Sequence, residues 1–274
     1  MLTQDIWKIE PLAQIPHDKI AIGSWVWGSD YYHGRFSLLD LPQKAAELDI
    51  QQIECNDFIL PPPRFSRLTQ PFHKAIPYIN PDLWRYRRAS LTTLKKELDA
   101  RNQTCLCWAL NTDFTSPRVG WFANWFYHQW AIQAINILRP PLIRIIAGGT
   151  QTTPITGRLI QQMTNSVLLL LQRPSVKQIV FENHWGASTD MTQHIDIYRQ
   201  VRKNLHDDEK RCWRLCLDPF NLESENPEKS WERMAPYAGH VHLKLGRDHG
   251  RLLQILEGVG YTGMFTIEEL PSQP

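Results

Sequence analysis

Eight short apolar segments recur along the chain, and their spacing is typical of one strand followed by one helix. Each of them except the last is followed by residues with the pattern of a helix. The predicted strands lie at residues 20–28, 52–58, 104–110, 142–147, 178–181, 214–217, 239–244 and 264–267. Parallel strands that are covered on both faces are apolar almost throughout, as these segments are until their C-terminal ends. The pattern predicts an α/β fold in which eight parallel strands close into a single (β/α)8 barrel.

The length and the composition of the chain are compatible with one such barrel. The chain has 274 residues, of which 42% are hydrophobic, so it can bury a large core. A (β/α)8 barrel, also called a TIM barrel, typically takes about 250 residues. We therefore expect one domain over residues 1–274, with residues 1–19 as a leader segment over the bottom or the edge of the barrel.

The charge and the cysteines argue against several classes of protein. A net charge of +2 disfavours nucleic acid or an anionic membrane as a partner, and we interpret Arg85, Arg87 and Arg88 as an exposed helix face. We expect a cytoplasmic protein, because the five cysteines are scattered and no signal peptide or membrane span is evident. Cys105 and Cys107 are predicted to face one side of a strand and to pack in the core, since no second pair completes a zinc site. A homo-oligomer is compatible with the sequence.

The strand at residues 239–244 carries polar groups on one of its faces. Side chains alternate along a strand, so His240, His242 and Lys244 point one way while Val241 and Leu243 point the other. Buried imidazole and ammonium groups need water, a metal ion or an ionic ligand. We therefore expect this strand to end at a pocket. His240 lies deeper than His242, and we interpret it as a satisfied core group or as a support for the site.

Polar side chains also gather at the C-terminal ends of the other strands, which is where a barrel carries its active site. One comes from each of the last four strands: Glu182, Asp218, His242 and Glu268. Three carboxylates and one imidazole suit a divalent ion such as Mn²⁺, Co²⁺, Mg²⁺ or Zn²⁺. Without a cation the carboxylates would repel one another and take up protons. The alternative for any single carboxylate is a hydrogen bond to loop backbone.

Several motifs along the predicted strands resemble those of a known protein family. They are Ile-Glu-Cys-Asn at 53–56, Ile-Arg-Ile at 143–145 with Ala-Gly-Gly at 147–149, Phe-Glu-Asn-His-Trp-Gly at 181–186, Cys-Leu-Asp-Pro-Phe-Asn at 216–221, His-Val-His-Leu-Lys at 240–244, and Gly-Tyr-Thr-Gly at 260–263 leading to Ile-Glu at 267–268. In order, character and spacing they resemble the xylose isomerase-like TIM-barrel proteins, also called sugar phosphate isomerases/epimerases. The resemblance covers nearly the whole chain.

The resemblance implies a metal-dependent enzyme that acts on a small carbohydrate. One divalent metal ion would be held by Glu182, Asp218, His242 and Glu268. Glu182 and Glu268 would also be the catalytic acid and base, one removing a proton next to a carbonyl and the other returning one. The product is then an isomer or epimer of a sugar, sugar phosphate or inosose, formed through a metal-stabilised enediolate.

Eight further residues are candidates for contacts with the substrate. They are Trp25, Glu54, Asn56, Arg144, His184, Asn221, Lys244 and Arg247. Two have an equally plausible structural role, since Lys244 could pair with a carboxylate and Trp25, like Trp27, could belong to the core. Keto-sugar 3-epimerases carry a histidine three residues after the metal-binding aspartate and an arginine soon after the metal-binding histidine. This chain has Asn221 at the first position, and Arg247 could stand in at the second.

Three other functions remain as alternatives. A dehydratase of the same family would use the same residues. Endonuclease IV-type DNA repair enzymes resemble the chain at Glu182, Asp218 and His242, but their three-zinc cluster needs further histidines, for which His249 is the one partial match. A non-catalytic sugar-binding barrel would keep the fold without turnover. The presence of both Glu182 and Glu268 favours an enzyme, because a purely structural metal needs no flanking bases.

Overall fold

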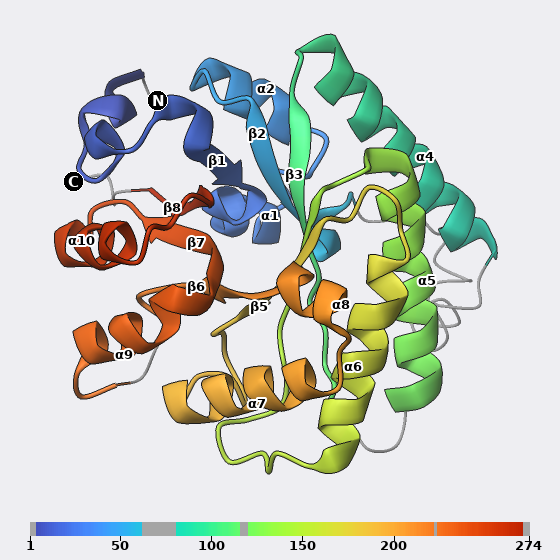
Figure 1. Ribbon diagram of the computed structural model, residues 1–274. Helices are drawn as coiled ribbons and strands as arrows, with labels where there is room; N and C mark the ends of the chain where they lie inside the picture. The colour runs from blue at the N-terminus through green and yellow to red at the C-terminus, as the bar shows by residue number, and fades with distance from the viewer. Residues whose placement is uncertain (1–3, 62–80, 116–119, 222–223, 271–274) are drawn as a thin grey trace.

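Eight parallel strands close into a barrel in the computed structural model, which describes residues 4–61, 81–115, 120–221 and 224–270 (Figure 1). The strands are β1 (Ile20–Gly23), β2 (Gln52–Asn56), β3 (Thr104–Ala109), β4 (Leu142–Ile145), β5 (Gln178–Glu182), β6 (Trp213–Leu217), β7 (Ala238–Lys244) and β8 (Met264–Glu269). Each strand pairs with the next along the chain, and β8 pairs with β1. The predicted α/β fold, a (β/α)8 TIM barrel, is confirmed.

Helices surround the barrel on its outer side (Figure 1). They are α1 (Gly28–Tyr32), α2 (Leu41–Glu47), α4 (Pro81–Ala100), α5 (Gly120–Leu138), α6 (Gly157–Leu171), α7 (Met191–Lys203), α8 (Asp207–Cys212), α9 (Pro227–Met234) and α10 (Gly250–Gly258). Polar side chains fix where some of them begin. The Thr156 hydroxyl accepts a hydrogen bond from the first turn of α6, and the Asp190 carboxylate does the same for α7.

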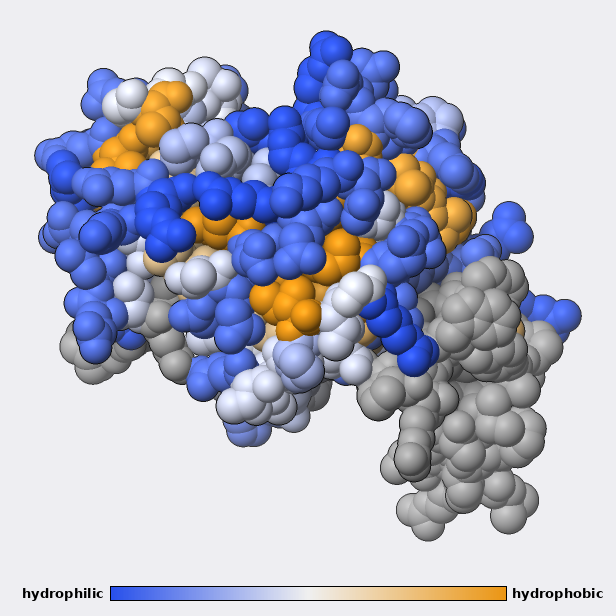
Figure 2. All heavy atoms as spheres, turned by 60° about the horizontal axis from the view of Figure 1, so that its bottom comes forward, coloured by the Kyte–Doolittle hydropathy of each residue, from blue (hydrophilic) through white to orange (hydrophobic). Residues whose placement is uncertain are grey.

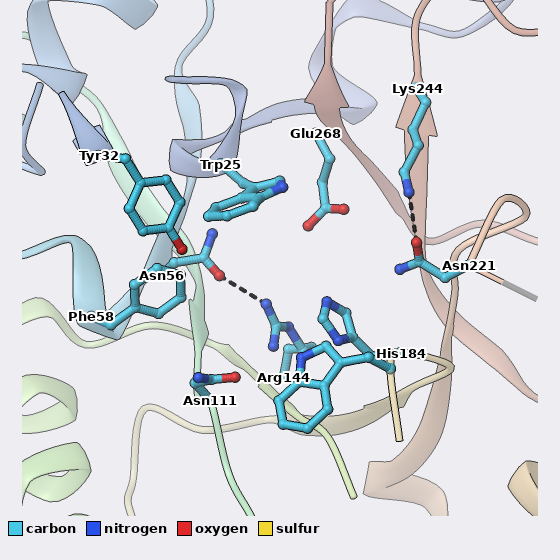
Figure 3. Close-up of a pocket in the computed structure, with 11 residues that line it drawn as sticks. Trp25, Tyr32, Asn56, Phe58, Asn111, Arg144, His184, Asn221, Lys244 and Glu268 are labelled. Atoms are coloured by element: carbon cyan, nitrogen blue, oxygen red, sulfur yellow. Dashed lines mark hydrogen bonds between the residues drawn. The ribbon is translucent and has the colours of Figure 1, made fainter. Parts of the chain in front are cut away.

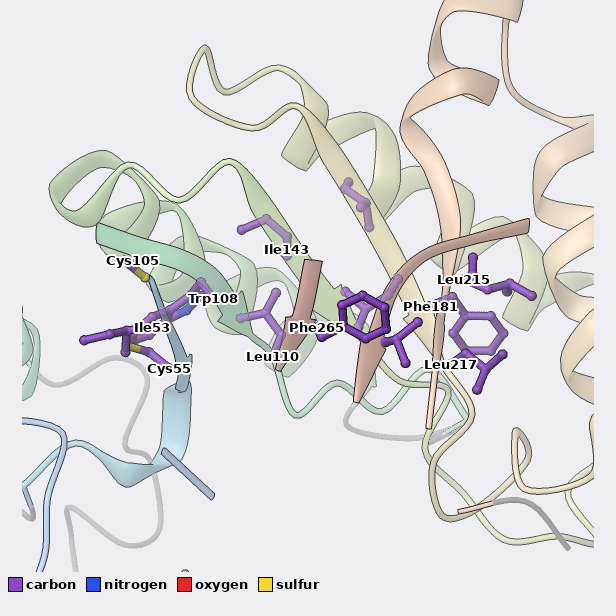
Figure 4. Close-up of a cluster of buried hydrophobic side chains, with 14 of the residues drawn as sticks. Ile53, Cys55, Cys105, Trp108, Leu110, Ile143, Phe181, Leu215, Leu217 and Phe265 are labelled. Atoms are coloured by element: carbon purple, nitrogen blue, oxygen red, sulfur yellow. The ribbon is translucent and has the colours of Figure 1, made fainter. Parts of the chain in front are cut away.

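The barrel has two cores, one outside the strands and one inside. Val241 and Leu243 of β7 are fully buried in the outer core, between the strands and the helices. Figure 4 shows part of this layer, in which Trp108, Phe181 and Leu215 come from three different strands. The inner core is a smaller cluster of Ala21, Leu106, Cys107, Ala109, Leu142, Val180 and Cys216. Because several of these side chains are small, the interior has room for the polar groups that lie nearer the C-terminal ends.

Strand β1 is shorter than the sequence predicts. It ends at Gly23, and residues 24–27 form a 3-10 turn, η4 (Ser24–Trp27). The Ser24 hydroxyl accepts hydrogen bonds from the Asn56 backbone N (2.9 Å) and from its side-chain amide (3.2 Å). This turn separates the two tryptophans: Trp27 is buried in the outer core, whereas Trp25 is 39% exposed at the mouth of the barrel.

Two predictions about individual side chains are wrong. Cys105 and Cys107 do not share a face, because the pairing of β2 with β3 shifts register between them, and they belong to the outer and inner cores respectively. Arg87 does not lie on an exposed helix face, since it is only 8% exposed. Its guanidinium carbon lies 4.2 Å from the centroid of the Trp130 ring, so the charge is stacked on an aromatic face.

The segment before β1 is ordered against the barrel. It consists of the 3-10 turns η1 (Gln4–Lys8), η2 (Leu12–Gln14) and η3 (His17–Lys19). Ile6, Leu12 and Ile15 are buried in the outer core. The Trp7 indole donates a hydrogen bond to the Leu48 carbonyl oxygen (3.1 Å), which lies just after α2. The segment therefore adds to the outer core rather than to the pocket.

The face of the molecule in Figure 2 carries mainly hydrophilic residues, with separate hydrophobic patches between them. Among the helices of the described residues, none combines the length and the apolar character that a membrane span requires. The large hydrophobic side chains that are exposed in this part of the chain are Trp25, Tyr32, Trp185 and Val259. The three aromatic ones line a single pocket.

Candidate functional site

Four ionisable side chains from the last four strands meet at the C-terminal end of the barrel. They are Glu182 at the end of β5, Asp218 directly after β6, His242 in β7 and Glu268 in β8. Each offers a candidate ligand atom, and these atoms all lie within 4.8 Å of one another. None of the four residues is more than 6% exposed. The residues that the sequence singled out are therefore brought together, while their role as metal ligands stays a prediction.

His242 lies between two of the carboxylates. Its Nδ1 atom is 3.3 Å from Glu182 Oε1 and 3.3 Å from Glu268 Oε2, and it makes no hydrogen bond within the described residues. Burial would lower the pKa of His242, but the acidic side chains around it, Cys216 and Glu268 foremost, raise it well above its usual value. Once Nδ1 releases its proton, its lone pair and the nearby carboxylate oxygens are a donor set for a divalent cation.

Two cationic side chains pair with the other oxygens of this cluster. Arg144 Nε is 3.0 Å from Glu182 Oε2, and Lys244 Nζ is 3.1 Å from Asp218 Oδ2. Burial would raise the pKa of Glu182, but the Arg144 guanidinium holds it well below its usual range. Burial raises the pKa of Asp218 to about 6, against the opposing effect of Lys244. The two carboxylates thus differ in how firmly the chain keeps them ionised.

A count of charges shows what the cluster lacks. Glu54 lies just beneath it, with its carboxylate 3.2 Å from the His242 ring. When the carboxylates are ionised and His242 is neutral, as a metal ligand must be, Glu54, Glu182, Asp218 and Glu268 supply four negative charges, and Arg144 and Lys244 supply two positive ones. Two negative charges remain, which equals the charge of one divalent ion. The donor set and the charge balance both fit such an ion.

A cavity of about 460 Å³ opens above the cluster (Figure 3). Its walls are formed by Trp25, Tyr32, Asn56, Phe58, Asn111, Arg144, His184, Trp185, Asn221, Lys244 and Glu268. Trp25, Tyr32 and Phe58 form an aromatic side, whereas Lys244 and Asn221 lie on the opposite side in this view. Trp25 packs edge-on against Tyr32 (6.1 Å between ring centroids) and Phe58 (5.9 Å). A cavity of this size, with one apolar and one polar side, suits a small polar molecule that has a C–H face.

No protein-family model matches the sequence, and no curated protein matches it either. Solved structures do match in fold. An AP endonuclease of family 2 from Brucella melitensis has a TM-score of 0.64 and 14% identity, over 93% of this chain and 94% of that one. The IOLI protein with a bound zinc atom has a TM-score of 0.61 and 13% identity, over 92% and 88%. A 3-keto-D-glucoside 4-epimerase from E. coli has a TM-score of 0.61 and 10% identity, over 93% and 94%.

Other matched structures include a probable 3-DHS dehydratase and several xylose isomerase domain proteins. The chain has the xylose isomerase-like fold. At identities of 14% or less, the likeness shows the fold and leaves the activity open. The expectation drawn from the sequence motifs is therefore confirmed at the level of the fold.

Most of the predicted substrate contacts lie in the cavity wall of this xylose isomerase-like barrel. The six that do are Trp25, Asn56, Arg144, His184, Asn221 and Lys244. Glu54 instead lies below the cavity, fully buried against His240 and His242. Arg247 lies in the turn after β7, outside the wall, with its guanidinium carbon 5.6 Å from the centroid of the Phe220 ring. Glu54 and Arg247 therefore do not line the cavity, and each contacts other side chains of the protein.

Hydrogen bonds hold several wall residues in place. Arg144 donates to Asn56 Oδ1 (2.8 Å), and Lys244 donates to Asn221 Oδ1 (2.7 Å), as Figure 3 shows. Asn221 in turn donates to Glu182 Oε1 (3.3 Å), which links the wall to the four-residue cluster. Burial lowers the pKa of His184, so this imidazole is neutral near pH 7 and can accept or donate a hydrogen bond.

Four wall residues were not among the predicted contacts: Tyr32, Phe58, Asn111 and Trp185. Tyr32 belongs to the short helix α1, and Phe58 belongs to the 3-10 turn η5 (Asp57–Ile59). The sequence placed residue 58 in a continuous strand, which hid the turn. Asn111 lies two residues after the end of β3 and Trp185 three residues after the end of β5, so their position just past a strand was the signal that could have identified them.

The described residues also bear on the endonuclease alternative. Two groups of His, Cys, Asp or Glu are placed to hold a metal among them, and both contain His242: the four-residue cluster and the group of Glu54, His240 and His242. His249 is not part of either group, because its ring contacts the backbone at Lys244 and Arg247. Within the described residues, a three-metal cluster rich in histidine is not formed.

Proposed function

We propose that this chain is a divalent-metal-dependent isomerase or epimerase of a sugar, sugar phosphate or inosose. The observation that carries the proposal is the convergence of Glu182, Asp218, His242 and Glu268 beneath a cavity of small-molecule size. An epimerase and a zinc-binding protein among the structures of the same fold support it. The reaction class is proton transfer at a carbon next to a carbonyl.

The metal ion in this proposal is Mn²⁺, Co²⁺, Mg²⁺ or Zn²⁺, held by the four converging side chains. When bound, it would supply positive charge that polarises the carbonyl oxygen of the substrate and makes the neighbouring carbon more acidic. The Nδ1 atom of neutral His242 and the two uncompensated negative charges around it fit this ion. His242 serves as a ligand only and takes no part in the proton transfer.

Glu268 and Glu182 are the proposed acid and base. Glu268 is the carboxylate of the cluster that also lines the cavity, so it can exchange a proton with a substrate carbon directly. Glu182 comes from β5 and Glu268 from β8, three strands apart around the barrel, so the two glutamates would approach a bound substrate from different sides. Arg144 keeps Glu182 ionised, as a base must be. We assign proton removal to Glu182 or Glu268, according to the face of the sugar, and proton return to the other.

The remaining wall residues would bind and orient the substrate. Arg144, His184 and Lys244 present hydrogen-bond donors to substrate oxygens, and the two cations would stabilise negative charge on them. The aromatic side formed by Trp25, Tyr32 and Phe58 would stack on the C–H face of a sugar ring.

The test is an exchange experiment with a panel of ketoses, ketose phosphates and inososes. The metal-loaded protein is incubated with each compound in D2O, and deuterium incorporation is followed by NMR together with product identity. Incorporation at the carbon next to the carbonyl, with formation of an isomer or epimer, supports the proposal. Loss of water instead would identify a dehydratase. Tight binding without exchange would identify a sugar-binding protein, and incision of abasic-site DNA would identify a repair enzyme.

A further inference from the structure

Beneath the four-residue cluster, Glu54 connects two histidines across the interior of the barrel. Glu54 comes from β2, whereas His240 and His242 come from β7, which does not pair with β2. Glu54 Oε2 lies 2.9 Å from His240 Nε2, and Glu54 Oε1 lies 3.2 Å from His242 Nε2. All three side chains have no exposed surface. An unpaired carboxylate at this depth would be strongly destabilising. One imidazole beside each of its oxygens offsets that cost.

The contacts of His242 determine which of its nitrogens carries the proton. Nε2 faces Glu54 Oε1, with the weakly interacting Cys216 Sγ at 3.5 Å. Nδ1 faces the carboxylates of the cluster above. A carboxylate is an acceptor only, so Glu54 keeps a hydrogen on Nε2 of His242. The proton that His242 must release to bind a metal ion is then the one on Nδ1, and its release directs the Nδ1 lone pair at the cluster.

His240 holds Glu54 in this orientation. Its Nε2 atom contacts Glu54 Oε2 and also lies 2.9 Å from the Thr266 hydroxyl of β8. The rings of His240 and His242 are perpendicular, with 5.3 Å between their centroids, so the two imidazoles approach the carboxylate from different directions. The carboxylate therefore cannot rotate away from His242 without losing its buried hydrogen bond to His240.

We propose that Glu54 is a positioning residue that directs the Nδ1 lone pair of His242 to the metal centre, and that His240 keeps Glu54 in place. The inference rests on the proposed metal centre but not on the reaction that the centre performs. A ligand histidine whose other nitrogen donates to a carboxylate is oriented before the ion arrives and is a stronger donor. Glu54 thus sets metal affinity without touching the metal or the substrate.

The first experiment measures metal affinity of the full chain by competition with a chromophoric chelator, using Zn²⁺ and Mn²⁺. Glu54→Gln keeps the size of the side chain but removes its charge, and we expect it to weaken binding about 10- to 100-fold. The matched control is Asp57→Asn, which changes a second buried carboxylate just after the same strand. Asp57 accepts its hydrogen bonds from Tyr127 and the Asn111 backbone rather than from a histidine. The control should change affinity by less than about 3-fold, which is under 1 kcal/mol. Equal affinities of Glu54→Gln and the unmodified chain would overturn the inference.

The second experiment does not depend on the folding of Glu54→Gln. The ring nitrogens of the Zn²⁺-loaded chain, labelled with ¹⁵N at histidine, are observed by long-range ¹H–¹⁵N NMR, and His242 is assigned by the signals that His242→Gln removes. We expect Nε2 of His242 to be protonated and Nδ1 to be unprotonated. The reverse arrangement would overturn the inference even if Glu54→Gln does not fold.

These two readouts separate the inference from the proposed function. If no sugar is turned over but Glu54→Gln still weakens metal binding, the role of Glu54 stands and the reaction assignment fails. If sugars are epimerised while Glu54→Gln binds metal normally, the reaction assignment stands and the role of Glu54 fails.

Discussion

Arg144 in β4 and Glu182 in β5 form an ion pair inside the barrel, with the guanidinium Nε 3.0 Å from Glu182 Oε2. The two side chains are 5% and 0% exposed. The same guanidinium donates hydrogen bonds to Asn56 Oδ1 (2.8 Å) and to the Leu110 carbonyl oxygen (3.2 Å). Arg144 therefore joins the four-residue cluster to the wall of the cavity, and its planar group is matched to these three partners.

Removal of Arg144 should destabilise the metal-free chain strongly. Arg144→Met leaves the buried Glu182 carboxylate without its partner, and we expect the free energy of unfolding to fall by about 3–5 kcal/mol. Chemical denaturation measures this change. The control is Arg35→Met, which breaks the exposed pair with Asp30 and should cost at most about 1 kcal/mol. An effect of Arg144→Met no larger than that of Arg35→Met would contradict the account of this ion pair.

Glu268→Gln should abolish most of the turnover and leave the fold intact. An amide cannot accept or return a proton, and general acid–base catalysis typically contributes about 10²–10⁴-fold in rate. Glu269→Gln is the matched control, because this neighbour on the same strand is exposed and outside the cavity wall. Deuterium exchange rates measure the effect, and circular dichroism checks the fold. Full activity of Glu268→Gln would show that another residue moves the proton.

The stability of the chain should fall as the pH is lowered below neutrality, in part because of His194. This side chain of α7 has no exposed surface, packs against Phe181 with 4.3 Å between ring centroids, and makes no hydrogen bond from either ring nitrogen within the described residues. Burial lowers the pKa of His194 to about 3. Between that value and the ordinary pKa of about 6.5, the unfolded chain binds the extra proton, so the free energy of unfolding decreases as pH falls.

His194 should lower the free energy of unfolding by about 1.4 kcal/mol for each pH unit well below pH 6.5. The total loss at pH 5 is then about 2 kcal/mol. Denaturation of the unmodified chain and of His194→Leu at pH 7 and pH 5 isolates this contribution, because other titrating groups are common to both. His194→Leu should lose less stability on acidification. Identical losses in the two proteins would rule out a buried neutral histidine at this position.

Val241→Asp should prevent folding. Val241 has no exposed surface and lies in the outer core, between β7 and the helices, where an unpaired carboxylate has no partner. Val259→Asp is the control, since Val259 is 43% exposed after α10 and should change stability by at most about 1 kcal/mol. Circular dichroism and denaturation compare the two. A native-like spectrum for Val241→Asp would mean that β7 is oriented differently.

The fold and the four-residue cluster could be predicted because both follow from simple periodicities. Alternation along β7 separates His242 from Val241, whatever the neighbouring strands do. In a parallel barrel, the C-terminal ends of all strands meet at one rim, so Glu182, Asp218 and Glu268 must approach His242 once the barrel is recognised. Neither step needs the register between strands.

The depth of each side chain could not be predicted, because it depends on register and on where strands end. Glu54 was expected at the substrate, but pairing of β2 with its neighbours places its carboxylate one layer lower, on the histidines. The bulge between β2 and β3 separates Cys105 from Cys107 for the same reason. The burial of Arg87 depends on α5, a helix far along the chain that supplies Trp130.

The most direct test of this account is to locate the metal ion. Crystals grown with Mn²⁺ or Co²⁺ are measured at wavelengths on both sides of the absorption edge of that metal, so that its anomalous scattering marks its position. We predict one strong peak at the end of the barrel, about 2.0–2.3 Å from atoms of Glu182, Asp218, His242 and Glu268, with His242 bound through Nδ1. A fully loaded crystal with the ion elsewhere, or with none at these four side chains, would contradict the central claim.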